Sequence, residues 1–288
     1  MNHSKRVKLT KSCRDSEYIP KVKDSGGVEY IDNTKCQIMH NGVKVIYGGY
    51  HGDWMAEIIK DLHGHHEPQE EKVFYEILKQ IKNNATMLEL GSYWGYYSAW
   101  FNKEIEGARN YLVEPNPAKL EIGKKNFALN NMDGNFFNAY VGEISRERSA
   151  FVDWDGKEYP LPMVCIDDFL HEQDISFLDI LHSDIQGAEL DMLKGAKKSL
   201  GELKIGFVVL STHGDRHEPC RILLSDYGYR MIAAHTPHES ASADGLLVMQ
   251  SPLLQEIPPV SITKNKENLF DKFIRFVSYN IRKITGSG

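Results

Sequence analysis

Segments with the pattern of strands and segments with the pattern of helices alternate five or six times between residues 68 and 250. The segment 205–212, IGFVVLST, is almost wholly apolar, which is typical of a strand buried on both faces of a sheet. We expect strands at 86–90, 110–114, 135–141, 177–184, 205–212, 229–234 and 245–249, and helices that begin at Pro68, near Gly95 and at Pro117 or cover 188–200 and 217–227. This alternation predicts an α/β fold with a doubly wound sheet, whose ligands bind beyond the carboxyl ends of its strands.

The chain divides into an expected N-terminal extension (1–67), a main domain (68–252) and a C-terminal tail (253–288). Residues 1–25 are polar and basic, and we expect a loose arm there. The dipeptide Asn41-Gly42 predicts a two-residue hairpin turn between KCQIMH and VKVIYG. Residues 269–284 have the pattern of a basic amphipathic helix. Packing of that helix on the domain, or on a partner subunit of a homo-oligomer, is favoured over peripheral contact with a membrane surface.

Charge and cysteine usage exclude several classes of protein. Lys and Arg total 34 against 40 Asp and Glu, so the net charge of −6 argues against a general nucleic-acid binder. No apolar run approaches the roughly 18 residues that span a bilayer, and the basic N-terminus lacks the apolar stretch of a secretory signal. The four cysteines lie far apart without a CxxC pair. We therefore expect a reduced, cytoplasmic protein with free thiols and no cysteine-based zinc site.

The segment MLELGSYWG carries the first ligand signal, in which Gly91 and Gly95 flank Ser92 and Tyr93 after a buried strand. This GxxxG spacing differs from the GxGxxG of dinucleotide-binding enzymes. Glu89 stands just before the first glycine, where its charge would repel a pyrophosphate but would attract the sulfonium and ammonium of S-adenosylmethionine. Taken alone, the segment is equally compatible with a plain corner between a strand and a helix.

Two further strand ends add to this signal. Glu114 ends the next strand, 19 residues after Gly95, where a carboxylate can accept both ribose hydroxyls of an adenosine. Asn116 then caps the helix that begins at Pro117. Asn138 and Tyr140 end the third strand, where adenine would lie, although an ordinary strand end explains them as well. The order of these features favours an adenosine-type ligand.

Four segments resemble the FkbM-type, class I S-adenosylmethionine-dependent methyltransferases: ELGSYWGYYS, VEPNP, CIDDFL and LDILHSDIQGAELDMLKGA. The last segment is the most specific, and the residues in it that match the family pattern are Asp184, Gly187, Glu189, Leu193, Gly195 and Ala196. His182 and Gln186 depart from the pattern, because the family usually has Lys and Glu there. The resemblance covers roughly residues 68–250.

This resemblance implies a Rossmann-like domain with a mostly parallel, seven-stranded sheet and a final antiparallel strand. It also implies methyl transfer from S-adenosylmethionine, most often to an oxygen of a sugar or natural product. The cofactor-binding residues that we expect are Glu89, Gly91, Ser92, Tyr93, Gly95, Glu114, Asn116, Asn138, Tyr140 and Asp184.

Candidate catalytic groups follow two strands that should be neighbours in the sheet. HSDIQGAE supplies His182, Asp184 and Glu189, and STHGDRH supplies His213, Asp215 and His217. One hypothesis makes His213 the general base that deprotonates a hydroxyl and Asp184 the group that orients it. Another has Asp184, His213 and His217 bind a divalent cation that lowers the pKa of the hydroxyl. Solvated loop histidines are the alternative to both.

The segment DLHGHHEPQEE holds three more histidines, His63, His65 and His66, just before the first helix of the domain. We favour a loop at the edge of the active site over a metal site there, since the spacing fixes no coordination geometry. Tyr47, Tyr50 and Trp54 could present an aromatic surface to a sugar ring, but packing is the favoured role.

The sequence thus predicts an O-methyltransferase that acts on a saccharide or a small hydroxylated metabolite. Two alternatives stay open: a nicotinamide-dependent oxidoreductase, and a non-catalytic module that binds adenosine within an assembly. GxxxG in place of GxGxxG, with Glu89 before it, counts against the oxidoreductase.

Overall fold

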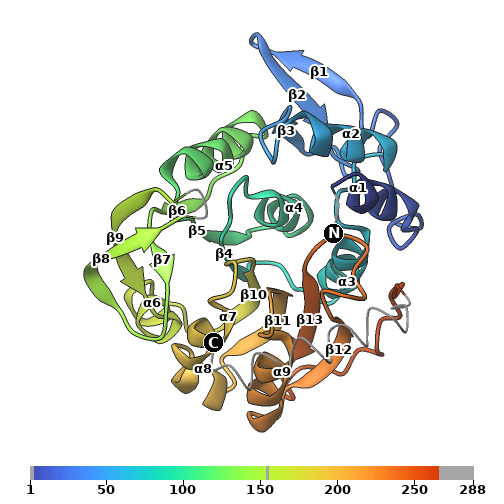
Figure 1. Ribbon diagram of the computed structural model, residues 1–288. Coiled ribbons are helices and arrows are strands. Elements are labelled where there is room, and N and C mark those ends of the chain that lie inside the picture. The colour runs from blue at the N-terminus through green and yellow to red at the C-terminus, as the bar shows by residue number, and fades with distance from the viewer. Residues whose placement is uncertain (1–2, 154–155, 266–288) are drawn as a thin grey trace, which may run out of the picture.

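The computed structural model describes residues 3–153 and 156–265, which are built around a seven-stranded sheet (Figure 1). The strands of this sheet are β4 (Thr86–Leu90), β5 (Arg109–Val113), β6 (Asn135–Phe137), β10 (Leu178–Ser183), β11 (Ile205–Thr212), β12 (Arg230–His235) and β13 (Gly245–Gln250). They lie in the order β12-β13-β11-β10-β4-β5-β6. Within this sheet β13 runs antiparallel to the other six strands, which are parallel to one another. The predicted α/β fold with a mostly parallel sheet and a final antiparallel strand is confirmed.

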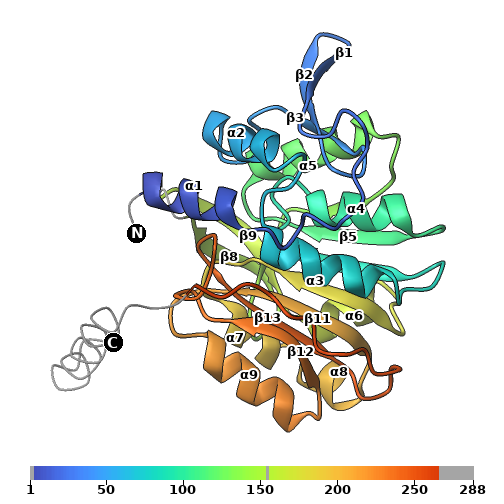
Figure 2. The same cartoon turned by 90° about the vertical axis from the view of Figure 1, so that its right-hand side faces the viewer.

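Helices cover both faces of the sheet, so the sheet is doubly wound (Figure 2). One face carries α3 (Pro68–Leu78), α4 (Tyr96–Glu104) and α5 (Pro117–Leu129), and the other carries α6 (Ile166–Glu172), α7 (Glu189–Lys194), α8 (Lys197–Gly201) and α9 (His217–Asp226). Each helix directs an apolar stripe at the sheet, as Val73, Phe74 and Ile77 of α3 illustrate. Strands β4 and β11 are buried along their whole length because they lie between these two layers.

The N-terminal segment is not the expected loose arm. It contains α1 (His3–Ser12), and the side chain of Ile19 is 2% exposed within the same core cluster as α3 and α4. Thr10 also donates a hydrogen bond from Oγ1 to the carbonyl oxygen of Ala241, at 2.8 Å. The prediction was wrong because a few buried side chains hold this polar segment, and such isolated positions create no periodic pattern.

A small antiparallel sheet and a helix complete the N-terminal region: β1 (Val28–Ile31), β2 (Thr34–Ile38), β3 (Lys44–Ile46) and α2 (Asp53–Asp61). The hairpin at Asn41-Gly42 is present, but its loop has three residues rather than two, because Met39 N–H donates to the carbonyl of Val43 at 2.8 Å. Gly42, with φ +85°, ends that loop as the left-handed residue of a bulged turn. A two-residue turn with positive φ instead joins β1 to β2, at Asp32-Asn33.

Two predicted elements are each divided in the structure. The strand expected at 135–141 splits into β6 and β7 (Tyr140–Val141), and β7 joins a second small sheet with β8 (Arg146–Val152) and β9 (Glu158–Val164). The helix expected at 188–200 splits into α7 and α8 near Gly195. A Cβ atom on Gly195 would lie 2.5 Å from the carbonyl oxygen of Gly142, so the chain needs a glycine to pass this strand end.

The basic amphipathic helix predicted for residues 269–284 lies outside the described residues. Within residues 3–153 and 156–265, no helix has the length and apolarity required to cross a bilayer.

Candidate active site

A cavity of about 610 Å³ lies beyond the carboxyl ends of β4, β5 and β10. Of the predicted site residues, those in its wall are Glu89, Gly91, Ser92, Tyr93, Glu114, Tyr140, His182 and Asp184. The predicted residues outside that wall are Gly95, Asn116, Asn138, His213 and His217. The cavity thus occupies the end of the sheet where doubly wound folds bind their ligands.

Glu89 begins the cofactor end of the cavity. It pairs in register with His182 on the neighbouring strand β10, and its side chain is 4% exposed. Its Oε2 accepts a hydrogen bond from the backbone N–H of Ser98 at 2.9 Å. Burial raises the pKa of this carboxyl, while the charge of His182 opposes the shift. A cation bound in the cavity would favour the ionised form of Glu89.

Gly91 lets the ends of two strands approach each other. Its φ is +69°, and a Cβ atom there would lie 2.0 Å from the carbonyl oxygen of Asp184. Gly95, at φ +68°, is the N-cap residue of α4, and a Cβ atom there would lie 2.9 Å from the side chain of Leu112. The two glycines therefore shape the turn through backbone conformation and close packing, which the GxxxG spacing predicts.

Glu114 is held as a hydrogen-bond acceptor beside this turn. Its Oε2 accepts from the backbone N–H of Tyr93 at 3.1 Å and its Oε1 from the backbone N–H of Asn116 at 2.8 Å. Burial raises the pKa of Glu114 to about 7, although these hydrogen bonds favour the ionised form. A carboxylate so placed can accept the hydroxyls of a ribose.

Asn116 supports the site without lining the cavity. Its Oδ1 accepts from the backbone N–H groups of Ala118 and Lys119, so it caps α5 as predicted. Its Nδ2 donates to Oδ2 of Asp153 at 2.8 Å. Asp153 is buried in the cavity wall next to β8, a residue that sequence reasoning missed.

Asn138 and Tyr140 have different roles. Asn138 Nδ2 donates to the carbonyl oxygens of Glu114 and Pro115, at 2.9 and 2.8 Å, and thereby braces the turn after β5. Tyr140 lies in the cavity wall, and its ring centroid is 5.3 Å from that of Phe151 on β8. These two rings provide an apolar surface of the kind on which an adenine can pack.

The acceptor end of the cavity contains a buried network around Glu70 of α3. Glu70 Oε1 lies 2.7 Å from Nε2 of His182, and Oε2 accepts from Oγ of Ser211 at 2.9 Å. The ring of Tyr97 packs against His182, with centroids 4.3 Å apart. Burial alone would lower the pKa of His182, but the hydrogen bond and charge of Glu70 outweigh it and raise the pKa. The environment of His182 thus favours its protonated form, at the position where the family usually has a lysine.

His213 and Asp184 lie close together, as the order of β10 and β11 predicts. His213 Nε2 is 3.3 Å from Asp184 Oδ1 and 3.2 Å from Asp244 Oδ1, while Nδ1 is 2.6 Å from Glu189 Oε1. Burial lowers the pKa of His213, but these carboxylates more than compensate and raise it to about 10. Both ring nitrogens face carboxylates, an arrangement that suits the imidazolium rather than a free base.

Asp184 contributes a partly buried carboxylate to the cavity wall. Removal from solvent raises the pKa of Asp184 to about 7, against the opposing charge of His213. Gln186 donates from Nε2 to Asp184 Oδ1 at 3.0 Å, so the second departure from the family pattern contacts the same carboxylate. A group that titrates near neutral pH is suited to general base catalysis.

The structure does not support a cation bound by Asp184, His213 and His217. His217 Nδ1 instead lies 2.9 Å from Oγ1 of Thr212. Among the described residues, the group whose ligand atoms lie close enough to share a metal ion is His40, His65 and Glu71. The loop at 63–66 does border the cavity as predicted, because His66 lies in its wall.

Aromatic side chains form another part of the wall. Tyr50 stacks on Trp94 with centroids 4.6 Å apart and an interplanar angle of 4°, and Tyr93 and His51 pack beside Tyr50. Tyr50 comes from the N-terminal extension, so that region contributes directly to the cavity.

The order of the sheet and the cavity at its carboxyl ends define a class I, Rossmann-like methyltransferase that depends on S-adenosylmethionine. The model of the Methyltransferase FkbM domain matches residues 80–231, and the chain belongs to this family. Family membership decides in favour of a methyltransferase over an oxidoreductase. No curated protein sequence matches the chain.

Solved structures similar to this chain include three methyltransferases. M. capricolum TrmK in complex with S-adenosyl-homocysteine is 13% identical, with 75% of this chain and 87% of that chain covered and a TM-score of 0.46. A precorrin-6y methyltransferase from Geobacter metallireducens is 12% identical, with 62% of this chain and 88% of that chain covered and a TM-score of 0.41. A SAM-dependent methyltransferase from Aquifex aeolicus is 13% identical, with 63% of this chain and 89% of that chain covered and a TM-score of 0.37.

The donor set of the cavity fits S-adenosylmethionine. Glu89 and Glu114 are buried carboxylates whose pKa burial raises, so a cationic ligand with hydroxyl donors offsets the cost of ionising them. The turn at Gly91–Tyr93 would lie against the methionine part, Glu114 would hold the ribose, and Tyr140 would lie against the adenine.

Proposed function

We propose that this chain transfers a methyl group from S-adenosylmethionine to a hydroxyl group of a saccharide or a small hydroxylated metabolite. The observation that carries the proposal is the composition of the acceptor end of the cavity. That end combines the stacked Tyr50 and Trp94 with hydrogen-bonding groups on Glu67, Glu70 and Ser211. Aromatic faces beside carboxylates and hydroxyls suit a polyhydroxylated ring, which has apolar faces and a polar rim.

The charges of the cavity wall favour an acceptor without phosphates. Lys119 is the only Lys or Arg among the described residues of the wall, and it belongs to α5 at the cofactor end, 3.5 Å from Asp153. The acceptor end presents Glu67, Glu70 and Asp184, and the imidazoles of His66 and His182 there are paired with Glu67 and Glu70. A nucleic acid or another polyphosphate would meet these carboxylates unfavourably, which agrees with the net charge of −6.

Asp184 is the proposed general base. When bound, S-adenosylmethionine supplies a methyl carbon that its sulfonium already activates. The carboxylate of Asp184 accepts the proton of the acceptor hydroxyl, so that the oxygen becomes a better nucleophile as it meets the methyl carbon. His213 and Gln186 orient this carboxylate through Oδ1. The cavity wall aligns the two reactants, which contributes much of the rate.

A panel of acceptors incubated with radiolabelled methyl donor tests this proposal. We expect label in neutral oligosaccharides or polyols, in an ether bond that survives alkali, and much slower labelling with the Asp184→Asn variant. Label found instead on amines, protein or RNA would contradict the proposed acceptor class. Binding of the cofactor without turnover on any acceptor in the panel would favour a non-catalytic module.

A further inference from the structure

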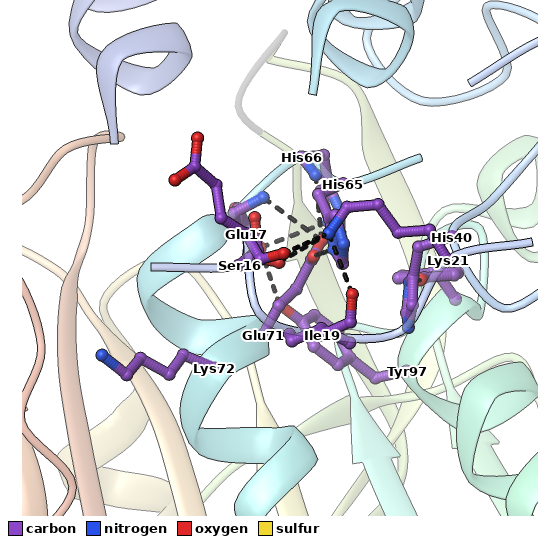
Figure 3. Close-up of polar contacts among 12 residues, drawn as sticks. Ser16, Glu17, Ile19, Lys21, His40, His65, His66, Glu71, Lys72 and Tyr97 are labelled. Atoms are coloured by element: carbon purple, nitrogen blue, oxygen red, sulfur yellow. Dashed lines mark hydrogen bonds and ion pairs between the residues drawn. The ribbon is translucent and has the colours of Figure 1, made fainter. Parts of the chain in front are cut away.

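Three buried side chains, which Figure 3 shows with their polar contacts, bring metal-binding atoms together. They come from three segments: His40 from the hairpin loop, His65 from the loop before α3, and Glu71 from α3 itself. Each offers one ligand atom, and these atoms all lie within 4.8 Å of one another. The side chains are 2%, 0% and 0% exposed, so solvent does not satisfy them.

The contacts within this cluster leave bonding capacity unused. Glu71 Oε1 accepts from the backbone N–H groups of His66 and Glu67, at 2.9 and 3.3 Å, and lies 2.6 Å from Nδ1 of His66. Its Oε2 contacts Nδ1 of His65. The other ring nitrogen of His65, Nε2, is buried without a hydrogen-bond partner. A buried nitrogen without a partner is costly to a fold unless something binds there.

Lys21, on which the charge of Glu71 acts, bonds to backbone oxygens. Lys21 donates from Nζ to the backbone carbonyl oxygens of Ser16, Glu17 and Ile19, at 2.9, 3.0 and 2.9 Å (Figure 3). These three bonds use the three donors of an ammonium group. His66 and Glu67 take up Oε1 of Glu71, so Oε2, which faces His65, is the carboxylate oxygen that a ligand would use.

We propose that His40, His65 and Glu71 bind one divalent transition-metal ion, zinc in the first instance. Two imidazoles and one carboxylate form a donor set that suits zinc and its neighbours, whereas magnesium and calcium prefer oxygen ligands alone. The hydroxyl of Tyr96 lies 2.9 Å from Nδ1 of His40. When that nitrogen donates to the hydroxyl, Nε2 of His40 is the ligand atom, which is the usual arrangement of a metal-binding histidine.

The imidazole rings of His40 and His65 stack with centroids 4.3 Å apart and an interplanar angle of 17°. A metal ion lies near the plane of each imidazole that binds it, so metal binding turns one ring out of this stack. The ion would tie the N-terminal hairpin to α3, directly behind His66 and Glu70 of the cavity wall. Its role is therefore structural, and the site is separate from Asp184 and His213.

Metal content and stability of the full chain test the site without any assay of activity. The chain is stripped with a strong chelator, incubated with Zn²⁺ or Co²⁺, desalted and measured by plasma mass spectrometry. We expect about one equivalent per chain, together with a Tm that rises on reloading. His40→Gln, His65→Gln and Glu71→Gln should each lose most of the retained metal. The matched controls, His63→Asn on the exposed part of the same loop and His213→Gln in the active site, should retain it.

A measurement on the wild-type chain keeps the test decisive if the variants fold poorly. The Co²⁺-loaded chain, labelled with ¹⁵N-histidine, should show paramagnetically shifted N–H signals from two histidines. Retention below about one tenth of an equivalent for both ions would overturn the proposal. Equal retention by the Glu71→Gln variant, or loss of metal only in the His213→Gln variant, would overturn it as well.

Discussion

Glu70 and His182 form an ion pair, with 2.7 Å between Oε1 and Nε2, that joins the first turn of α3 to the end of β10. Both side chains are almost fully removed from solvent, and Ser211 on β11 donates to the second carboxylate oxygen. The acceptor wall is therefore one hydrogen-bonded unit built from a helix and two neighbouring strands.

Removing one partner of this pair should destabilise the fold strongly. Glu70→Gln leaves the His182 cation buried without its counter-charge, and such changes cost about 3–5 kcal/mol. Glu76→Gln, near the surface of the same helix, should cost less than about 1 kcal/mol. Urea denaturation of both variants gives the comparison. Similar losses of unfolding free energy in the two variants would show that the buried pair stabilises the fold no more than the exposed glutamate does.

The pair also gives stability a dependence on pH. The pKa of His182 is raised in the folded chain, so its contribution is complete below the pKa of an unfolded histidine. The stability that His182 contributes is lost as pH rises through the pKa of His182 in the folded chain. This part of the dependence should disappear in the Glu70→Gln variant.

Asp184 should control the rate of methyl transfer. Asp184→Asn is expected to lower kcat by about 10²–10⁴-fold, because the amide cannot accept the proton of the acceptor. In the wild-type chain, kcat should rise with pH and level off above about pH 7, where this carboxyl is ionised. Single-turnover rates across pH measure both effects. A His213→Gln variant that lost all activity, beside a fully active Asp184→Asn variant, would restore His213 as the base.

The strands and the cofactor end could be predicted because their signals are local. Apolar runs such as 205–212 define buried strands, and Glu89 and Glu114 occupy fixed places at strand ends. Glu70 could not be predicted in the same way, because a glutamate in the first turn of an amphipathic helix normally faces solvent. It is buried here because residues far along the chain, His182 and Ser211, contact it.

The hairpin of β8 and β9 shows the same limit. RERSAFV is mostly charged or polar and exposed along β8, so it carries no sign of a buried strand. Its contributions to the cavity, Phe151 and Asp153, depend on where the hairpin folds back over the sheet. That position is set by pairing with β9 and β7, which no local pattern encodes.

Gly91 should tolerate no side chain. Gly91→Ala places a Cβ atom 2.0 Å from the carbonyl oxygen of Asp184 and also strains a backbone at φ +69°. We expect a loss of about 3 kcal/mol or more. Gly214→Ala is the matched control, because Gly214 also has a positive φ of +58° but a Cβ atom added there would meet nothing within 4 Å. Gly214→Ala should lower the free energy of unfolding by only about 1 kcal/mol, which is the cost of a left-handed backbone for alanine. Equal losses would mean that the close approach has no energetic consequence.

Cofactor affinity should depend on the ionisation of Glu114. Burial raises the pKa of Glu114 to about 7, and ribose hydroxyls donate stronger hydrogen bonds to the ionised carboxylate than to the neutral carboxyl. The Kd for S-adenosylmethionine should therefore increase as pH falls from about 8 to about 6. Equilibrium dialysis with radiolabelled cofactor measures this change. Glu114→Gln should bind more weakly and without that dependence, so an unchanged pH profile in the variant would argue against the assignment.

The central claim is that the cavity between Glu89 and Glu114 holds S-adenosylmethionine. Isothermal titration of the full chain with S-adenosylmethionine, with S-adenosylhomocysteine and with NAD tests it most directly. We predict one molecule of either sulfur nucleoside per chain, no heat with NAD, and at least about tenfold weaker binding in the Glu114→Ala variant. Saturable binding of NAD without binding of either sulfur nucleoside would contradict the account.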